Sequence, residues 1–294
     1  KISSDINETP PLQISGKTKL HAIHYDLPIA SAQVKSSILL AGLYAEGITT
    51  LTEPAVTRDH TERMLISMGA KFNKSSNKLC IEGKNELHGC DISVPADLSS
   101  ASFIILAALI ARKADVLIQN VGINPTRTGV IDILKSMGAQ ITLENEQQSS
   151  GEPVADIRVK SSKLVGSVID PNLVSLAIDE FPVLFVAAAF SEGKTTFSGI
   201  GELRVKESDR ITAMSEGLKK LGIMVEEYPD GATIHGGEFS GGKIHSKGDH
   251  RIAMSLAVAG TIANEQVIIE DTDSVDTSFP RFCECMTKIG ADIQ

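Results

Sequence analysis

The side chains best suited to chemistry stand close together in residues 203–210, which read Leu-Arg-Val-Lys-Glu-Ser-Asp-Arg. An apolar pattern of helical period follows them, so we expect this stretch to open a helix. In a helix, Lys206 and Arg210 share one face, where two like charges destabilise the helix by roughly 0.2–0.5 kcal/mol. Glu207 can reach Arg210 but offers one negative charge against two positive ones. The pattern suits an external anion beside a carboxylate that moves protons, but taken alone the stretch is better explained as a solvated, charged first turn.

Other polar side chains gather where helices are expected to begin and where unpaired backbone N–H groups favour anions. Ser31 and Gln33 open one such helix, and Arg58 opens another within Thr-Arg-Asp-His-Thr-Glu, whose Asp and Glu form an acceptable capping pair. Asp179 precedes Glu-Phe-Pro and suits either a helix cap or a general base. Arg251 follows Asp-His at a fourth helix start. Each residue alone also fits an ordinary structural role, but their recurrence at several helix starts favours anion binding.

The composition excludes several classes of function. The net charge of −9 argues against a general nucleic-acid surface, because phosphate backbones need clustered Lys and Arg. The cysteines show neither C-x-x-C spacing nor a zinc-type histidine pattern; they are Cys80, Cys90, Cys283 and Cys285. We therefore expect free thiols in a reducing, cytoplasmic compartment, and no metal.

No apolar run in the sequence is long enough to span a bilayer, the longest being residues 103–111 and 181–190. We expect no membrane partner and see no signal peptide. The chain opens at Lys1 without Met, so we expect it to be a piece of a longer protein.

An internal repeat organises the chain. Each copy has a helix rich in small residues, a β-rich segment, a second helix that ends at an x-Gly-x signal, and further β-type runs. The copies begin near Ser31, Ser99, Asp179 and Asp249. We expect the glycine after each second helix to be a C-cap, because a positive φ costs glycine little.

The repeat predicts an α/β fold. Its unit is helix, strand, helix, strand, strand, and the first helices carry almost no charge, which suits full burial behind outer sheets. We expect a boundary that leaves one unit in residues 1–94 and three in residues 95–294. Because one unit cannot close a core, we expect the first domain to be incomplete. The polar stretch 144–152 is predicted to be an exposed loop.

Five motifs together resemble the 5-enolpyruvylshikimate-3-phosphate (EPSP) synthase family. They are Leu-Pro-Ile-Ala-Ser-Ala-Gln-Val-Lys-Ser at residues 27–36, Thr-Arg-Asp-His-Thr-Glu at 57–62, Ile-Asp-Glu-Phe-Pro at 178–182, the stretch 203–210, and Asp-His-Arg-Ile-Ala-Met at 249–254. They occur in the family's order across nearly the whole chain. The resemblance implies the enolpyruvyl transferase fold, in which six units form two inverse α/β barrel-like domains with buried helices and outer sheets. This chain resembles the last four units: residues 1–94 match the last unit of the shikimate-phosphate-binding domain, and residues 95–294 match the second domain.

The resemblance also implies an activity. The family transfers the enolpyruvyl group of phosphoenolpyruvate to the 5-hydroxyl of shikimate 3-phosphate and releases phosphate, without a metal or an organic cofactor. The resemblance further implies a cytoplasmic, monomeric enzyme of aromatic amino-acid biosynthesis with no nucleic-acid or membrane partner. The Ser-Ala-Gln form of the first motif resembles a bacterial group that is less sensitive to glyphosate.

Roles for single residues follow from the same resemblance. Shikimate 3-phosphate is expected to contact Ser31, Ala32, Gln33, Arg58, Asp179 and Lys206. Phosphoenolpyruvate is expected to contact Gln33, Arg210 and Arg251. In catalysis, Asp179 would accept the proton of the 5-hydroxyl, Lys206 would lie near that hydroxyl, and Glu207 would carry the proton of the methylene carbon.

Two departures and two alternatives limit the resemblance. The basic and polar groups that the family supplies from its first two units are not in this sequence, and Asp276 and Thr277 stand where a lysine usually precedes Ser-Phe-Pro. We therefore expect the 294 residues alone to be inactive. The related UDP-N-acetylglucosamine enolpyruvyl transferase shares fold and donor, but residues 206–210 and the Ser-Ala-Gln motif favour the shikimate enzyme. A non-catalytic anion-binding module is disfavoured because Asp179 and Glu207 are present.

Overall fold

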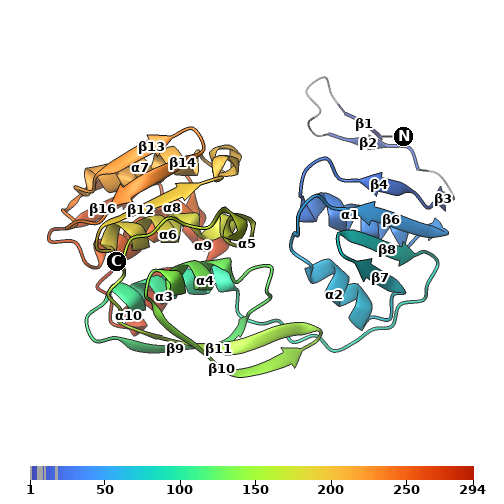
Figure 1. The fold of residues 1–294 in the computed structure, drawn as a ribbon, viewed down its shortest axis with the longest axis horizontal. Coiled ribbons are helices and arrows are strands. Elements are labelled where there is room, and N and C mark those ends of the chain that lie inside the picture. The colour runs from blue at the N-terminus through green and yellow to red at the C-terminus, as the bar shows by residue number, and fades with distance from the viewer. Residues whose placement is uncertain (1, 5–8, 10, 17–18) are drawn as a thin grey trace. The chain divides into compact units, whose positions relative to one another are not determined.

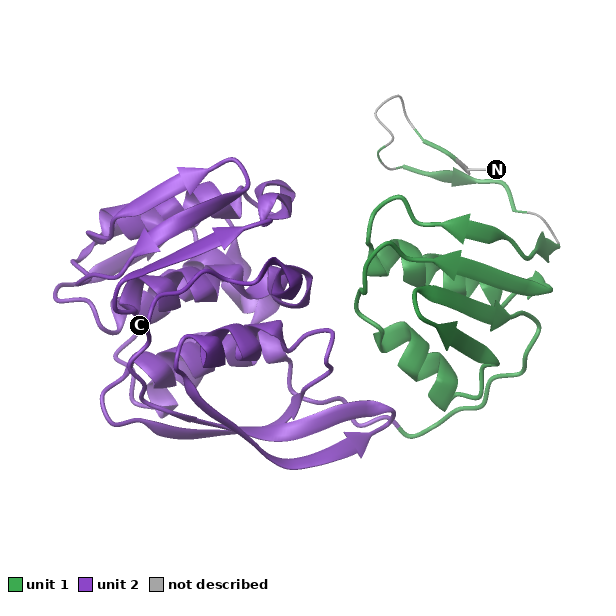
Figure 2. Ribbon diagram, viewed as in Figure 1, with its two compact units in different colours: residues 1–91 green, residues 92–294 purple. Residues whose placement is uncertain are grey.

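The chain folds into two compact units (Figure 2). The computed structural model describes residues 2–4, 9, 11–16 and 19–294, so Lys1 lies outside the described residues. Unit 1 covers residues 1–91 and unit 2 covers residues 92–294, a division close to the boundary expected between residues 94 and 95. Each unit is described by itself.

Unit 1 packs two helices against a four-stranded sheet of order β4-β6-β8-β7 (Figure 1). Its elements are β1 (Ile2–Ser3), β2 (Gln13–Ile14), β3 (Leu20–His21), β4 (His24–Asp26), α1 (Ala32–Gly42), β5 (Ala45–Glu46), β6 (Ile48–Thr52), α2 (His60–Ser67), β7 (Phe72–Ser75) and β8 (Lys78–Glu82). β4 runs parallel to β6, whereas the other pairs of this sheet are antiparallel. The remaining strands pair as β1-β2 and β3-β5.

The apolar core of unit 1 is small. It consists of two clusters of buried residues, one of Leu27, Leu51 and Leu79 and the other of Leu39, Leu65 and Ile81. Several large apolar side chains of α1 and α2 are exposed instead, namely Val34, Leu40, Met64 and Ile66. Unit 1 therefore buries far less apolar surface than unit 2, whose core is one continuous cluster.

Unit 2 contains the larger set of elements (Figure 1). They are α3 (Leu98–Ile110), β9 (Asp115–Gly122), α4 (Gly129–Ser136), β10 (Gln140–Ser149), β11 (Glu152–Lys160), η1 (Pro171–Leu173), α5 (Val174–Ala177), η2 (Ile178–Glu180), α6 (Phe181–Phe190), β12 (Lys194–Ser198), η3 (Gly201–Val205), α7 (Arg210–Lys220), β13 (Val225–Tyr228), β14 (Gly231–His235), β15 (Gly242–His245), α8 (His250–Gly260), β16 (Val267–Glu270), α9 (Ser274–Ser278) and α10 (Phe282–Lys288).

The order of these elements confirms the predicted repeat in three of its four copies; in the fourth, α8 and β16 are followed by α9 and α10 without the two closing strands. Helix, strand, helix, strand, strand recurs as α1-β6-α2-β7-β8, α3-β9-α4-β10-β11 and α6-β12-α7-β13-β14, and the last strand lies in the middle of each sheet. A strand before the first helix runs parallel to the strand after it, as in β4 with β6 and β15 with β16. Isolated parallel bridges from Ala96 to Val121 and from Val168 to Thr196 continue this pattern. The fold is therefore α/β with repeated units.

Glycine ends the second helix of each copy, as predicted. Gly69, Gly138, Gly222 and Gly290 have φ values of 89°, 98°, 88° and 97°. A side chain at such a φ clashes with the backbone, so glycine is the residue that stops these helices at the lowest cost.

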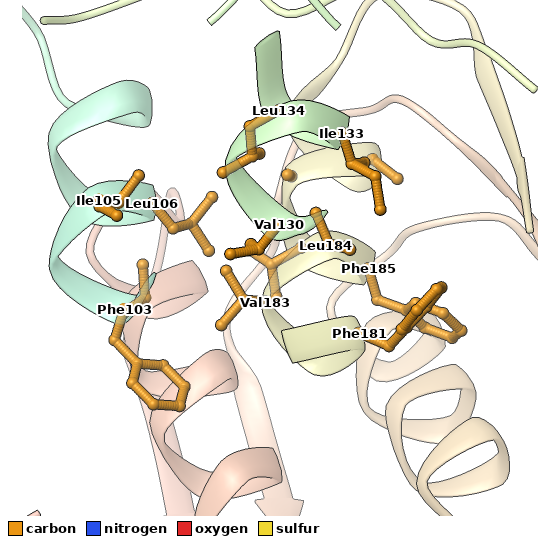
Figure 3. Packing of buried hydrophobic residues seen from close by; sticks show 14 of the residues in the cluster. Phe103, Ile105, Leu106, Val130, Ile133, Leu134, Phe181, Val183, Leu184 and Phe185 are labelled. Carbon is orange, nitrogen blue, oxygen red and sulfur yellow. The ribbon is translucent and has the colours of Figure 1, made fainter. Parts of the chain in front are cut away.

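Three apolar helices, α3, α6 and α8, pack against one another in the centre of unit 2. Nearly every residue of α3 and α6 is buried, because neither helix has a charged face to present to water. Figure 3 shows side chains of this core, among them Leu106, Val130 and Leu184, in close packing. Phe185 stacks on Phe197 of β12 with ring centroids 5.1 Å apart, which joins the inner helices to an outer sheet.

The consecutive helical segments that end in α6 need a separate comment. Together they cover Pro171–Phe190, a stretch long and apolar enough to cross a membrane by length and composition alone, so the prediction that the sequence holds no such run is wrong. In unit 2, 61% of its most apolar window is buried, and α6 packs against α3 and α8. This stretch is therefore explained as the core of unit 2.

The three core helices run in the same direction. Their C-terminal ends, at Ile110, Phe190 and Thr261, line one cavity of about 780 Å³. Their N-terminal ends are joined by contacts of Glu180 with Ser99 and Arg251. The N-terminus of a helix carries partial positive charge. Glu180 therefore lies where the partial positive charges of three helices meet.

Residues 144–152 are largely exposed, as predicted, but the predicted loop is wrong. β10 and β11 run through this stretch and turn only at Ser150 and Gly151, both of which have positive φ. Cross-strand pairing with β11 extends the strand although its residues are polar, because an exposed antiparallel strand needs no apolar side chains on its outer face.

Candidate active site

Arg210 lies at the centre of an ionic network in unit 2. It is the first residue of α7, and its side chain is buried with 1% of its surface exposed. Its Nε lies 2.8 Å from Oδ2 of Asp249, its Nη2 lies 2.5 Å from Oε2 of Glu207, and its Nη1 lies 3.7 Å from Oδ1 of Asp179. The expected contact between Glu207 and Arg210 is confirmed. One guanidinium thus holds three carboxylates from three separate segments.

The predicted helix over residues 203–210 is wrong, and with it the shared face of Lys206 and Arg210. The chain forms the short η3 turn, Lys206 is extended, and α7 begins only at Arg210. Asp209 is the N-cap residue: its carboxylate accepts the backbone N–H of Thr212 at 3.0 Å, which has no carbonyl acceptor within the first turn of α7. Lys206 forms an ion pair with Glu202 instead.

Asp249 is a site residue that the sequence analysis did not identify. It is the N-cap of α8, where it accepts hydrogen bonds from the backbone N–H of Arg251 at 2.9 Å and from the Ser208 hydroxyl at 3.0 Å. Burial alone would raise its pKa, but the hydrogen bond and charge of Arg210 hold the pKa of Asp249 below its ordinary value. An Asp at the N-cap position was visible in the sequence, but its arginine partner on α7 was not.

Arg251 links α8 to the segment before α6. Its Nη1 donates to the backbone carbonyl oxygen of Asp179 at 3.2 Å and lies 4.0 Å from Oε1 of Glu180. Burial, with the positive charge of Arg251, lowers the pKa of the neighbouring His250. Arg251 is therefore the second guanidinium close to Asp179.

Glu180 is a second residue that the sequence analysis left without a role. It is buried, the Ser99 hydroxyl donates to its Oε1, and Nη2 of Arg127 lies 3.6 Å from the same oxygen. Burial raises the pKa of Glu180, although Arg127 and Ser99 act in the opposite direction. The signal in the sequence was an acidic residue directly ahead of a wholly apolar helix.

This arrangement can bind an anion and move protons beside it. The side chain of Glu207 is 55% exposed, while Asp179 and Arg251 are 17% and 16% exposed, so solutes can reach these three side chains. An anion arriving there meets the partly exposed guanidinium of Arg251, while the guanidinium of Arg210 is buried and paired with Glu207. Glu207 and Asp179 are carboxylates, a group that can accept and release protons.

In unit 1, the Ser-Ala-Gln motif lies at the start of α1. Ser31 is the N-cap residue, and its hydroxyl accepts a hydrogen bond from the backbone N–H of Val34 at 3.3 Å. Ala32 and the exposed Gln33 form the first turn of this helix of 11 residues. The motif therefore presents a hydroxyl and backbone N–H groups at the positive end of a helix, which suits an anion.

Arg58 directly precedes the N-cap residue of α2, Asp59. The predicted capping pair of this helix is wrong. The carboxylate of Asp59 accepts from Nε of Arg63 at 2.9 Å and makes no side-chain cap bond, and Glu62 is buried and lies 2.7 Å from Nζ of Lys35. Glu62 cannot reach back to the cap because its partner is a lysine on another helix.

The structure therefore divides the predicted site residues into three groups. Asp179, Glu207, Arg210 and Arg251 come together in unit 2. Lys206 forms an ion pair with Glu202. Ser31, Ala32, Gln33 and Arg58 belong to unit 1, at the starts of α1 and α2.

Within the described part of the chain, no three side chains of His, Cys, Asp or Glu are grouped to hold a metal ion. The four cysteines are free thiols. The charged groups at the site are thus arginines and carboxylates that contact one another.

Comparisons with known proteins identify the family of the chain. The family model for EPSP synthase (3-phosphoshikimate 1-carboxyvinyltransferase) matches residues 1–286. The chain is 56% identical over 284 residues to the 3-phosphoshikimate 1-carboxyvinyltransferase of Alkalilimnicola ehrlichii and 52% identical over 293 residues to that of Nitrosococcus oceani. These matches cover 96% and 100% of this chain. The structure of EPSP synthase from Acinetobacter baumannii superposes with a TM-score of 0.94 at 51% identity, and the match covers 100% of this chain and 68% of that one.

The chain spans only part of these relatives, namely 64% of the Alkalilimnicola ehrlichii protein and 66% of the Nitrosococcus oceani protein. The matches nevertheless extend over both units and over every motif named above. By sequence and by fold, the chain belongs to the EPSP synthase (3-phosphoshikimate 1-carboxyvinyltransferase) family.

Proposed function

We propose that the chain is part of an enzyme that transfers the enolpyruvyl group of phosphoenolpyruvate to the 5-hydroxyl of shikimate 3-phosphate and releases phosphate, a step in aromatic amino-acid biosynthesis. The observation that carries the proposal is the buried Arg210 between Asp179, Glu207 and Asp249, with Arg251 beside it. Both substrates are anions, and this network offers two guanidinium groups together with two carboxylates that are partly open to solvent.

Phosphoenolpyruvate is proposed to bind Arg210 and Arg251, with Gln33 of unit 1 as a further contact. Planar guanidinium groups suit its carboxylate because they can donate two parallel hydrogen bonds. Nη2 of Arg210 now contacts Glu207, which is the more exposed of its partners. The substrate carboxylate would replace this contact and leave Glu207 close to the bound substrate.

Shikimate 3-phosphate is proposed to bind Ser31, Ala32, Gln33 and Arg58 of unit 1, together with Asp179 and Lys206 of unit 2. The start of α1 supports its phosphate with backbone N–H groups and the Ser31 hydroxyl. Lys206 is held by Glu202 and must leave that carboxylate to approach the acceptor.

The proton steps follow from these positions. Glu207, in its acid form, gives a proton to the methylene carbon, which places positive charge on the adjacent carbon. The 5-hydroxyl oxygen bonds to that carbon while its proton passes to Asp179, and a tetrahedral intermediate forms. Glu207 then removes a proton from the new methyl group, the carbon–oxygen bond to phosphate breaks, and Asp179 returns its proton to the leaving phosphate.

The experiment uses a chimera in which this chain is joined to the part of the Alkalilimnicola ehrlichii relative that it does not match. Phosphate release is measured with phosphoenolpyruvate and shikimate 3-phosphate, and in parallel with UDP-N-acetylglucosamine as acceptor. We expect turnover with shikimate 3-phosphate only. Turnover with the sugar nucleotide alone, or with neither acceptor, would refute the proposal.

The 294 residues alone are proposed to be inactive, since the family supplies further substrate contacts from its first two units. The same assay on the chain alone tests this, and robust turnover would contradict it. We further propose a cytoplasmic monomer; the four free cysteines support a reducing compartment.

A further inference from the structure

A buried ionic cluster in unit 1 has no place in the mechanism above. Lys35 lies on the face of α1 that also carries Leu39 and Gly42, and it is fully buried. Its Nζ lies 2.7 Å from Oε1 of Glu62 and 3.1 Å from Oε2 of Glu53. A lysine is almost never buried so deeply unless it is paired, so the two carboxylates explain its position.

The partners of Lys35 come from two other elements. Glu62 lies in the first turn of α2, and Glu53 directly follows β6. Lys35 also donates to the backbone carbonyl of Thr57 at 3.3 Å, and Thr57 donates its hydroxyl to Glu53 at 2.9 Å. One ammonium group therefore ties the first turn of α1 to the first turn of α2 and to the segment immediately before Arg58.

The cluster is not arranged for maximal stability. Oε2 of Glu62 and Oε1 of Glu53 are buried without a hydrogen-bond donor in the described part of the chain, and Oε1 of Glu53 has only Lys74 at 3.9 Å. Burial removes the water that would hydrogen-bond these carboxylate oxygens, and no donor among the described residues fully replaces it, which lowers stability. Buried ion clusters can often be replaced by apolar residues at no loss of stability. A contribution to stability therefore does not by itself explain why this cluster is present.

Its position indicates another reason. The helix starts that it joins carry Ser31, Ala32 and Gln33 on one side and Arg58 on the other. A second contact between the same turns, from the Ser36 hydroxyl to the Thr61 hydroxyl at 2.7 Å, maintains the same spacing. A ligand phosphate that contacts both starts binds well only if their separation is fixed in advance.

We propose that Lys35, Glu53 and Glu62 are positioning residues that set the spacing of the two helix starts and thereby the affinity for the phosphorylated acceptor. This inference rests on the proposed function, in which both starts bind shikimate 3-phosphate. None of the three touches substrate, so their effect falls on acceptor binding and leaves the proton steps in unit 2 unchanged.

The test compares three variants of the chimera. In the triple variant Lys35→Met, Glu53→Gln, Glu62→Met, every charge of the cluster is removed, so no buried charge is left unpaired. In Glu53→Gln alone, the ion pair between Lys35 and Glu62 and the acceptor for Thr57 remain. The control is Lys71→Met, which removes an exposed ion pair with Glu82 in the same unit.

We expect the KM and the Kd for shikimate 3-phosphate to rise about tenfold in the triple variant and about threefold in Glu53→Gln. The KM for phosphoenolpyruvate and kcat should stay within about twofold of wild type, and Lys71→Met should change nothing. If every folded variant keeps an acceptor KM within about twofold of wild type, the inference is overturned; if the triple variant does not fold, Glu53→Gln decides. An inactive wild-type chimera would instead overturn the proposed function, and calorimetric titration with shikimate 3-phosphate would still measure acceptor binding.

Discussion

Arg210 and Asp249 form a fully buried ion pair between the first residue of α7 and the N-cap of α8, with Nε and Oδ2 2.8 Å apart. Asp249 also accepts the backbone N–H of Arg251, so this carboxylate joins the two proposed donor-binding arginines. Through Glu207 and Asp179, the same guanidinium contacts both proposed proton carriers. A substitution at Asp249 should therefore change both the stability of unit 2 and the proposed catalysis.

Asp249→Asn should destabilise the protein by about 3 kcal/mol at pH 7, because it leaves Arg210 buried without its main counter-charge. The pKa of Asp249 is lowered in the folded state, so its ionised form contributes stability above the ordinary value of 3.8, and this is lost as the pH falls through the lowered pKa. The difference in free energy of unfolding between wild type and variant should therefore become smaller below pH 3.8. Urea unfolding from pH 7 to pH 3 measures it, and a gap that stays constant would contradict the argument.

Glu180 should show the opposite dependence on pH. Its pKa is raised by burial, so its contribution to stability is complete below the ordinary value of 4.5 and is lost as the pH rises through the raised pKa. Each unit of that shift corresponds to about 1.4 kcal/mol. Glu180→Gln should therefore gain stability relative to wild type as the pH rises above 4.5. Glu238→Gln, at an exposed residue, is the control. If the difference in free energy of unfolding between Glu180→Gln and wild type does not grow with pH, this account is refuted.

The repeat and the buried helices were predictable because their signals are local. A glycine such as Gly138 ends a helix through its own φ, and an uncharged run such as α6 has no face to show to water. The start of α7 was mispredicted because apolar periodicity was extended backward over Asp209, although an aspartate two residues before an apolar pattern is itself an N-cap signal.

The partners of buried charges were not predictable in the same way. Lys35 pairs with Glu53 and Glu62, and Arg210 pairs with Asp249, and each pair joins different elements. Sequence spacing carries information about neighbours on one helix but not about contacts made when the fold closes. The resemblance to a family named Arg210 as a site residue, but only the structure shows that it is buried among three carboxylates.

Glu207→Gln should lower kcat of the chimera by about 10²- to 10⁴-fold, because the amide can neither give nor take the proton of the methylene carbon. Its stability should change by less than about 1 kcal/mol, since the side chain of Glu207 is half exposed. Glu216→Gln is a matched control on α7, with 54% of its side chain exposed and an ion pair to Lys247. Single-turnover phosphate release measures the effect, and equal rates in the two variants would exclude Glu207 as the proton carrier.

Glu202→Gln should improve acceptor binding by releasing Lys206. Lys206 is proposed to contact shikimate 3-phosphate, yet it pairs with the exposed Glu202, so binding must first break this ion pair. An exposed pair is worth up to about 1 kcal/mol, which limits the fall in the acceptor KM to about fivefold. Salt weakens exposed ion pairs, so the advantage of the variant should shrink as ionic strength rises. Steady-state kinetics at low and high salt test both points. An acceptor KM that rises in Glu202→Gln would show instead that Glu202 holds Lys206 in its binding position.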